Sequence, residues 1–286
     1  MQLGPRDPLS GYRTTGHDWN GITELNTPVP RIVIFFLVVT TLYAVIGWIL
    51  LPAWPLGATF TKGLWGADQR RAADAVHATI AARRAPWESE ILSKDFAAIR
   101  ADPALMARID ASAPTLFGEN CQPCHGAQGR GGPGFPRLDG AAKVWGDDAE
   151  AMAETIRVGV NSAHPDSRVA QMPAFGKDGV LKRPDIDRLV AHVTALSKGE
   201  KGSPEGQKLF ADNCAACHGE DARGVAGTGA PDLTDSDWLY GGDPAALFAT
   251  LQNGRRGEMP TWEQRLSKAE IRILALYVEK LARTSK

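Results

Sequence analysis

The chain contains the pentapeptide CQPCH at residues 121–125 and a second copy of the same pattern, CAACH, at residues 214–218. The two copies use all four cysteines of the chain. Cysteines three positions apart on a helical turn point to the same side, so both thiols can form thioether bonds to one haem while the adjacent histidine reaches its iron. The pattern therefore predicts two covalently bound haem c groups, held by Cys121, Cys124 and His125 and by Cys214, Cys217 and His218.

An isolated Cys-x-x-Cys pair is also compatible with a disulfide or a zinc site. Here a histidine follows both pairs, and no spare cysteine or histidine pair is present to complete a zinc tetrahedron. The sequence thus favours haem attachment over both alternatives. The formal net charge of -1, without a long run of like charges, argues against a nucleic-acid-binding protein.

Residues 32–51 (IVIFFLVVTTLYAVIGWILL) contain no charge and no proline. An α-helix needs about 20 apolar residues to cross the hydrocarbon core of a bilayer. A buried core helix is disfavoured by the length of this run. A cleaved signal peptide is disfavoured by the same length, by the distance from Met1 and by the lack of an Ala-x-Ala site after the run. We therefore expect an uncleaved, single-pass membrane anchor.

The basic residues on the two sides of this segment do not determine its orientation. Covalent haem attachment is expected on the outer face of an energy-converting membrane. We therefore expect residues 1–31 to be cytoplasmic and the haem domains to be periplasmic, in the inner membrane of a bacterium. Residues 52–107 are predicted to be a helical linker, a solvated connector that also packs on a partner. Prolines are expected to divide the residues after Leu64 into short helices, at Pro86, Pro103 and Pro114.

The remaining chain is an internal repeat, residues 108–199 and 200–286. When the two haem motifs are aligned, Leu116-Phe117 matches Leu209-Phe210, and Met172-Pro173 matches Met259-Pro260 after a small change in loop length. Each repeat has the pattern of a helix ending at the cysteine pair, a glycine-rich loop, a middle helix, a Met-Pro loop and a last helix. In the second repeat, Ser267 and Glu270 form a capping box before that last helix. We predict an all-α fold with one N-terminal transmembrane helix and two tandem class I cytochrome c domains.

Met172 and Met259 are the candidate sixth ligands of the two irons. Both precede a proline, which stiffens the loop while the thioether projects toward the iron. His164 and His192 compete with Met172 in the first repeat, but the second repeat has no histidine besides His218. Symmetry then favours histidine and methionine at both irons. Spacing leaves open whether each methionine serves the haem of its own repeat, which is the simpler default, or reaches the neighbouring one.

An iron with histidine and methionine ligands has no open position for a substrate, so the sequence predicts one-electron transfer without catalytic residues. A dihaem peroxidase is disfavoured because it needs an iron that can open to peroxide. A membrane-anchored dihaem cytochrome that serves another periplasmic oxidoreductase remains the alternative.

The order of segments resembles subunit III of the cbb3-type cytochrome c oxidases, a membrane-anchored dihaem subunit. Residues 14–31 (TTGHDWNGITELNTPVPR) are similar to the Gly-His-x-Trp-Asp-Gly-Ile-x-Glu-x-Asn-x-Pro-x-Pro segment of that family, with Asn20 where the family usually has aspartate. The glycine, proline and asparagine content of this run would also allow a disordered cytoplasmic tail, but His17, Trp19 and Glu24 favour a docking surface at the membrane.

The resemblance implies a relay of electrons in respiration. The donor would be a cytochrome c or the cytochrome bc1 complex. The partners would be a single-haem membrane cytochrome c subunit and the catalytic haem-copper oxidase subunit, which reduces oxygen and pumps protons. The chain itself lacks the histidine clusters of a haem-copper centre. It is therefore expected to be a subunit of that enzyme and not its catalyst.

Overall fold

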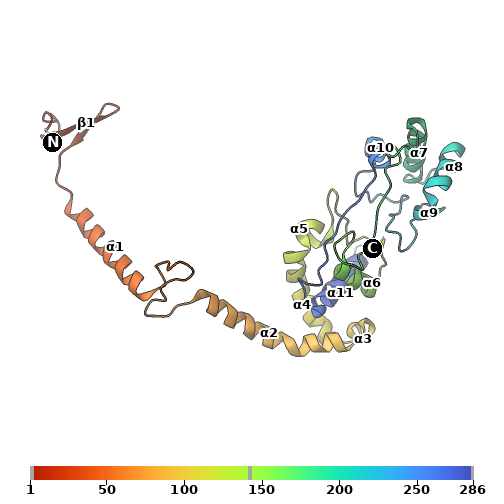
Figure 1. Cartoon of the computed structure of the whole chain (residues 1–286), viewed down its shortest axis with the longest axis horizontal. Coiled ribbons are helices and arrows are strands. Elements are labelled where there is room, and N and C mark those ends of the chain that lie inside the picture. The colour runs from red at the N-terminus through yellow and green to blue at the C-terminus, as the bar shows by residue number, and fades with distance from the viewer. Residues whose placement is uncertain (1–2, 141–143, 285–286) are drawn as a thin grey trace. The chain divides into compact units, whose positions relative to one another are not determined.

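The structure, a computed structural model, describes residues 3–140 and 144–284 (Figure 1). These residues form two compact units, one that ends at Arg83 and one that begins at Arg84. The predicted helical class is confirmed, because the haem-motif region is built from helices. Within the described residues, the one sheet is a small hairpin in the N-terminal unit.

The hairpin pairs strand β1 (Thr14–Trp19) with strand β2 (Ile22–Leu25) in antiparallel order. Its turn residues, Asn20-Gly21, both have positive φ angles, 55° and 90°. Asn-Gly favours this type I′ geometry, whose twist matches that of the paired strands. Nδ1 of His17 lies 3.2 Å from the carboxylate of Glu24 on the opposite strand. The run that resembles the family segment is thus folded as a hairpin in the structure.

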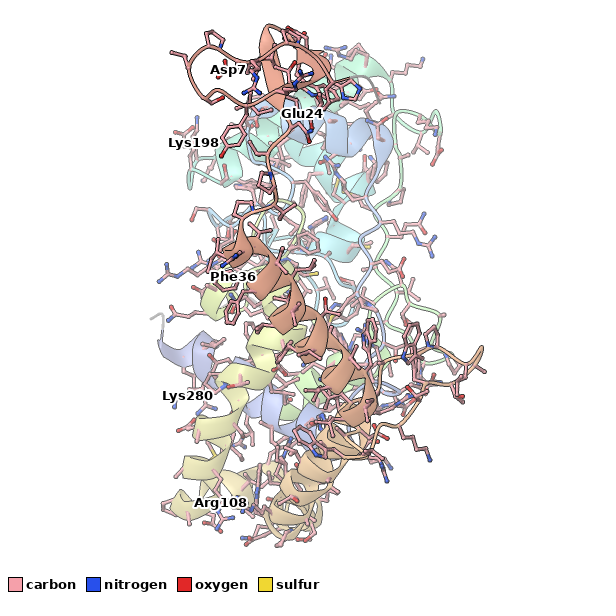
Figure 2. All side chains as sticks on the ribbon, turned by 90° about the vertical axis from the view of Figure 1, so that its left-hand side faces the viewer. Asp7, Glu24, Phe36, Arg108, Lys198 and Lys280 are labelled. Atoms are coloured by element: carbon pink, nitrogen blue, oxygen red, sulfur yellow. The ribbon has the colours of Figure 1, made fainter. Side chains whose placement is uncertain are left out.

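Helix α1 (Arg31–Leu50) follows the hairpin, and its bounds differ by one residue from the predicted anchor. It is long and apolar enough to cross a membrane, and none of its side chains is buried in the protein. Phe36 is one of these exposed apolar side chains (Figure 2). A helix that is apolar on all sides matches a lipid environment.

Two prolines lie inside helices. Helix α2 (Gln69–Ser93) continues through Pro86, and helix α4 (Pro103–Asn120) continues through Pro114. The prediction that these two prolines separate short helices is therefore wrong, whereas Pro103 does begin a helix. An interior proline costs about 3 kcal/mol. Packing next to each proline offsets this cost, since Ile91 and Ala113 are fully buried.

The later part of the predicted linker belongs to the C-terminal unit. Ile91 of α2, Ile99 of helix α3 (Phe96–Arg100) and Leu105 of α4 are buried in the same core as helix α11 (Lys268–Thr284). Arg100 also lies 3.1 Å from both carboxylate oxygens of Glu279 on α11. From Arg84 onward the segment therefore differs from a solvated connector, because it packs on the last helix.

Seven further helical elements lie in the described part of this unit. Asp148, Ser203 and Asp243 each cap a helix through the side chain. The predicted capping box of α11 is present, because the backbone N–H of Ser267 donates to Glu270 (2.9 Å) and that of Glu270 donates to the Ser267 hydroxyl (3.2 Å). The elements are α5 (Gln122–His125), η1 (Ala127–Gly129), α6 (Ala149–Val158), α7 (Arg183–Leu196), α8 (Pro204–Asn213), α9 (Ala215–His218) and α10 (Pro244–Asn253).

The helices of the C-terminal unit pack around two hydrophobic cores that do not follow the two sequence repeats. The core of the first lobe joins α4 and α6 of the first repeat to α11 of the second. The core of the second lobe joins α8 and α10 of the second repeat to α7 of the first. Figure 1 shows these two groups of helices. The repeats have therefore exchanged their last helices, and the second lobe is inserted between α6 and α11.

Glu279 connects the former linker to α11, and its loss should destabilise the C-terminal unit. Its side chain is 7% exposed and binds Arg100 and, at 3.1 Å, Arg283. The substitution Glu279→Ala leaves Arg100 without its carboxylate and should lower the free energy of unfolding by about 2 kcal/mol. Urea unfolding of the haem-loaded chain measures this loss. The control Lys208→Ala breaks only an exposed pair with Asp212 and should leave the midpoint unchanged. Equal unfolding midpoints for both variants would contradict a stabilising role of Glu279.

Candidate haem-binding sites

Both Cys-x-x-Cys-His motifs have the same backbone geometry. The carbonyl of Cys121 accepts hydrogen bonds from the N–H groups of Cys124 (3.1 Å) and His125 (2.8 Å), which closes one helical turn. Cys214 does the same for Cys217 (3.1 Å) and His218 (2.9 Å). One turn brings both thiols to the same side, as attachment to a single haem requires. None of these cysteines forms a disulfide.

Each motif histidine is oriented by a proline carbonyl. Nδ1 of His125 donates to the carbonyl of Pro136 (2.9 Å), and Nδ1 of His218 donates to that of Pro231 (3.0 Å). A carbonyl accepts only from a protonated nitrogen, so the bond fixes the tautomer in which Nε2 carries the lone pair that binds a metal. Burial lowers the pKa of His218, although the Pro231 bond opposes this shift. A neutral imidazole is the form that an iron ligand needs.

The first cysteine of each motif is a poor thiolate. Burial, with a smaller effect of the neighbouring cysteine, raises the pKa of Cys121 and of Cys214 to about 11. Thiolates are the form of cysteine that binds zinc. Among residues 3–140 and 144–284, no group of three or more histidine, cysteine, aspartate or glutamate side chains is placed to hold a metal ion. A pair of thiols on one helical turn with an oriented histidine fits haem attachment better than a zinc site.

The two methionine loops are held by matching backbone pairs. Met259 and Val160 exchange two N–H···O bonds of 2.9 Å, and Met172 and Arg255 exchange two of 2.9 and 3.0 Å. Glycine at the end of the adjacent middle helix makes each pair possible. Gly159 (φ 74°) and Gly254 (φ 69°) adopt backbone angles that favour glycine, and a side chain there would overlap the carbonyls of Met259 and Met172, respectively.

These pairs bring each methionine to the hydrophobic core that the haem motif of the other repeat also contacts. Met259 packs on the core of the first lobe, together with Cys121. Met172 packs on the core of the second lobe, which contains Cys214. The simpler default, with each methionine beside the motif of its own repeat, therefore differs from the observed packing. The reason is the exchange of the last helices, which carries each Met-Pro loop into the other lobe.

The two competing histidines have other contacts. His164 is bonded through both ring nitrogens, Nδ1 to the N–H of Asp166 (3.0 Å) and Nε2 to the carboxylate of Glu263 (2.8 Å). His192 is 5% exposed and lies inside the second lobe, with its ring 5.5 Å from that of Phe210. Tyr277 and Phe117 form the matching aromatic pair of the first lobe at 5.4 Å. His192 thus occupies a packing position between two helices.

Sequence reasoning missed the residues that place the ligands. Pro136 and Pro231 orient the histidines, and Gly159 and Gly254 receive the methionine loops. The glycines had a signal, since each follows the middle helix at the same place in its repeat. The two prolines also had a signal, since the sequence Pro-x-Leu follows both haem motifs, but nothing in that pattern shows that the proline carbonyl is the acceptor.

Comparison with known proteins gives consistent family matches. Family models match residues 11–58 (N-terminal domain of cytochrome oxidase-cbb3, FixP), 111–197 (cytochrome c) and 203–278 (cytochrome c oxidase, cbb3-type, subunit III). The cbb3-type cytochrome c oxidase subunit FixP of Bradyrhizobium diazoefficiens is 42% identical over 279 residues, which cover 96% of each chain. Subunit CcoP of an Azospirillum species is 41% identical over 98% of this chain and 99% of its own. Subunit CcoP of Cereibacter sphaeroides is 40% identical over 94% of each.

The buried position of His192 predicts a pH dependence of stability. Desolvation lowers the pKa of His192 below the ordinary value of 6.5. The unfolded chain then binds a proton more readily than the folded one, so stability falls as the pH drops below about 6.5. In unfolding experiments at several pH values, the substitution His192→Phe should reduce the fall in the free energy of unfolding below about pH 6.5. Val193→Ala, which removes buried methyl groups from the same helix, should lower stability equally at every pH. If His192→Phe leaves the pH dependence of the free energy of unfolding unchanged, the prediction is contradicted.

Proposed function

The chain belongs to the family of cbb3-type cytochrome c oxidase subunit III, and from this premise we propose that it relays electrons through two covalently bound haem c groups. As a family member it is a membrane-anchored cytochrome c subunit of such an oxidase. The observation that carries the proposal is the repeated arrangement of paired thiols, an oriented histidine and a methionine loop, once in each lobe.

The proposed ligand sets cross the sequence repeats. In the first lobe, Cys121 and Cys124 would attach the haem, and His125 and Met259 would supply the ligands of its iron. In the second lobe, Cys214 and Cys217 attach the haem, and His218 and Met172 bind the iron. The packing of Met259 with Cys121 and of Met172 with Cys214 supports these sets.

The chain's residues act by holding two redox centres in a fixed setting. A haem iron with these two ligands exchanges one electron, and a methionine ligand raises its reduction potential relative to a second histidine. Pro136 and Pro231 keep the imidazoles oriented, and the backbone pairs at Val160 and Arg255 hold the methionine loops.

Location and partners follow from the anchor and the family. We infer that α1 spans the bacterial inner membrane once, with the hairpin in the cytoplasm and both haem lobes in the periplasm. Electrons would come from a cytochrome c or the cytochrome bc1 complex. They would pass through a single-haem cytochrome subunit to the haem-copper subunit, which reduces oxygen and translocates protons. The match over residues 11–58 supports this destination over another periplasmic oxidoreductase, because it covers the hairpin and anchor.

The crossed ligand sets are testable in chains that carry a single haem. Cys121→Ala together with Cys124→Ala leaves only the haem at Cys214 and Cys217. In that background, Met172→Leu should lower the midpoint potential on the order of 0.1 V, because leucine fills the space without binding iron. Met259→Leu should leave the potential unchanged. Redox titration with optical detection measures both, and the reverse result would establish pairing within each repeat.

The assignment to the oxidase is tested by purification. A tagged full-length chain, solubilised in a mild detergent, should copurify with a haem-copper oxidase subunit and a single-haem cytochrome. The purified complex should consume oxygen with reduced cytochrome c as donor. A chain that purifies from respiring cells with another oxidoreductase, and never with an oxidase, would refute the assignment while leaving the haem sites intact.

A further inference from the structure

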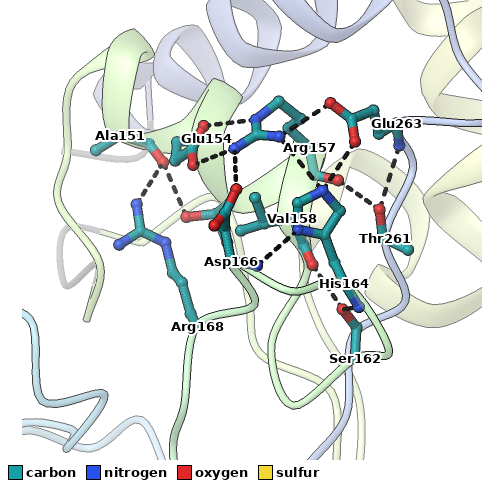
Figure 3. Close-up of polar contacts among 11 residues, drawn as sticks. Ala151, Glu154, Arg157, Val158, Ser162, His164, Asp166, Arg168, Thr261 and Glu263 are labelled. Atoms are coloured by element: carbon teal, nitrogen blue, oxygen red, sulfur yellow. Dashed lines mark hydrogen bonds and ion pairs between the residues drawn. The ribbon is translucent and has the colours of Figure 1, made fainter.

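A cluster of charged side chains lies where the last turn of α6 meets the chain that follows Met259 (Figure 3). At its centre, the Arg157 guanidinium bonds to Glu154 (2.8 Å) and Glu263 (2.9 Å) and lies 3.4 Å from Asp166. His164 bonds to Glu263 at 2.8 Å. We call these five residues the Arg157 cluster. The cluster joins the two sequence repeats, because Glu263 belongs to the second repeat and its partners belong to the first. Glu263 follows Met259 by four residues, so these contacts lie next to the methionine loop of the first lobe.

His164 can donate to Glu263 in only one tautomer. Its Nδ1 accepts the backbone N–H of Asp166 (3.0 Å), so Nε2 carries the proton that Glu263 accepts. The side chain of His164 is 10% exposed, and its Nε2 lies 3.4 Å from the Arg157 guanidinium. Glu263 therefore accepts from two fixed donors, and the bond from His164 followed by that from Arg157 lowers the pKa of its carboxyl group. The carboxylate is ionised at neutral pH and held in one position.

Backbone and side-chain bonds connect this cluster to Met259. After the pair of Met259 with Val160, the hydroxyl of Thr261 donates to the carbonyl of Arg157 (2.6 Å), and the N–H of Trp262 donates to that of Ile156 (3.2 Å). The segment from Met259 to Glu263 thus runs along the end of α6, with hydrogen bonds from Met259, Thr261 and Trp262 to residues 156–160. At the end of this segment, Glu263 binds Arg157 and His164.

The second lobe lacks the charged part of this arrangement. In the described residues from Met172 to Lys177, the hydrogen bonds to the end of α10 and to Arg255 join backbone groups: Met172 with Arg255, Gly176 N–H to the Leu251 carbonyl (3.3 Å) and Lys177 N–H to the Gln252 carbonyl (2.9 Å). Counted from the methionines, Ala174 and Gly176 stand where the first lobe has Thr261 and Glu263. Counted from the helix-end glycines, Gln252 stands where the first lobe has Arg157. No ion pair can form between these counterparts.

We propose that the Arg157 cluster is a positioning device for one of the two haem irons. It holds the Met259 loop so that the thioether stays bound to the iron of the haem on Cys121 and Cys124, whereas the Met172 loop is held without such a device. This inference rests on the crossed ligand sets proposed above. Its consequence is that the methionine of the first lobe leaves its iron less readily than that of the second.

The test uses the full-length, haem-loaded chain with one haem at a time. The background Cys214→Ala with Cys217→Ala keeps the first-lobe haem, and Cys121→Ala with Cys124→Ala keeps the second. Into each we place Glu263→Gln, which removes the charge at constant shape. Binding of carbon monoxide to the ferrous haem measures how readily methionine leaves. The absorption band of methionine-bound ferric haem and the midpoint potential report the bond itself.

We expect Glu263→Gln to increase carbon monoxide binding roughly fivefold in the first background, since a charge-assisted pair of bonds is lost. The ferric band should weaken and the potential should fall. The second background should not respond. Glu263→Asp, which keeps the charge, should restore part of the wild-type behaviour. The control Glu200→Gln removes the same charge from an exposed site after α7 and should change neither haem.

Other outcomes would overturn the inference. Equal effects in both backgrounds, or a lower thermal midpoint without any change at the haem, would make the cluster merely structural. If Met259→Leu abolishes the ferric band in the first background while Glu263→Gln does nothing, the crossed ligands stand and the positioning role fails. If Met259→Leu has no effect there, the ligand assignment itself fails. Should Glu263→Gln not fold, Thr261→Val removes the neighbouring bond and tests the same loop.

Discussion

The backbone pairing of each methionine loop with the middle helix of the other repeat is the constraint on which the rest of the C-terminal unit depends. Met259 reaches Val160, and Met172 reaches Arg255. Once these pairs form, α11 must pack on α4 and α6, and α7 must pack on α8 and α10. Neither repeat can then complete a core alone, so the two lobes are joined by two crossing connections and not by a single linker.

This arrangement suits a relay subunit. An electron that moves between two centres benefits from a fixed separation, and two lobes that share their helices hold a separation better than two domains on a flexible linker. The end of the linker contributes as well, because Ile91 and Ile99 pack with α11 and Glu279 binds Arg100. At the same time, the two methionine loops are not held alike, since Glu263 has no counterpart in the second lobe. With a haem in each lobe, as proposed, one scaffold would therefore give the two irons different properties.

The local features could be predicted from the sequence, but the exchange of the last helices between the repeats could not. The Cys-x-x-Cys-His motifs, the apolar anchor and the Ser267 capping box are set by residues near each other in the chain, and all were predictable. The exchange depends on which of two similar helices packs on which core. Ile186, Leu189 and Val193 of α7 and Ile271, Leu274 and Val278 of α11 give nearly the same apolar pattern, so periodicity cannot distinguish the partners. Pro86 and Pro114 were misread because tertiary packing outweighed a local preference.

The central claim is that each iron takes its histidine from one repeat and its methionine from the other. A crystal structure of the haem-loaded chain measures this directly, as the distance from each iron to the sulfur of Met172 and of Met259. The account predicts that His125 and Met259 bind the same iron, with His218 and Met172 on the second. An iron bound by His125 and Met172 would contradict it.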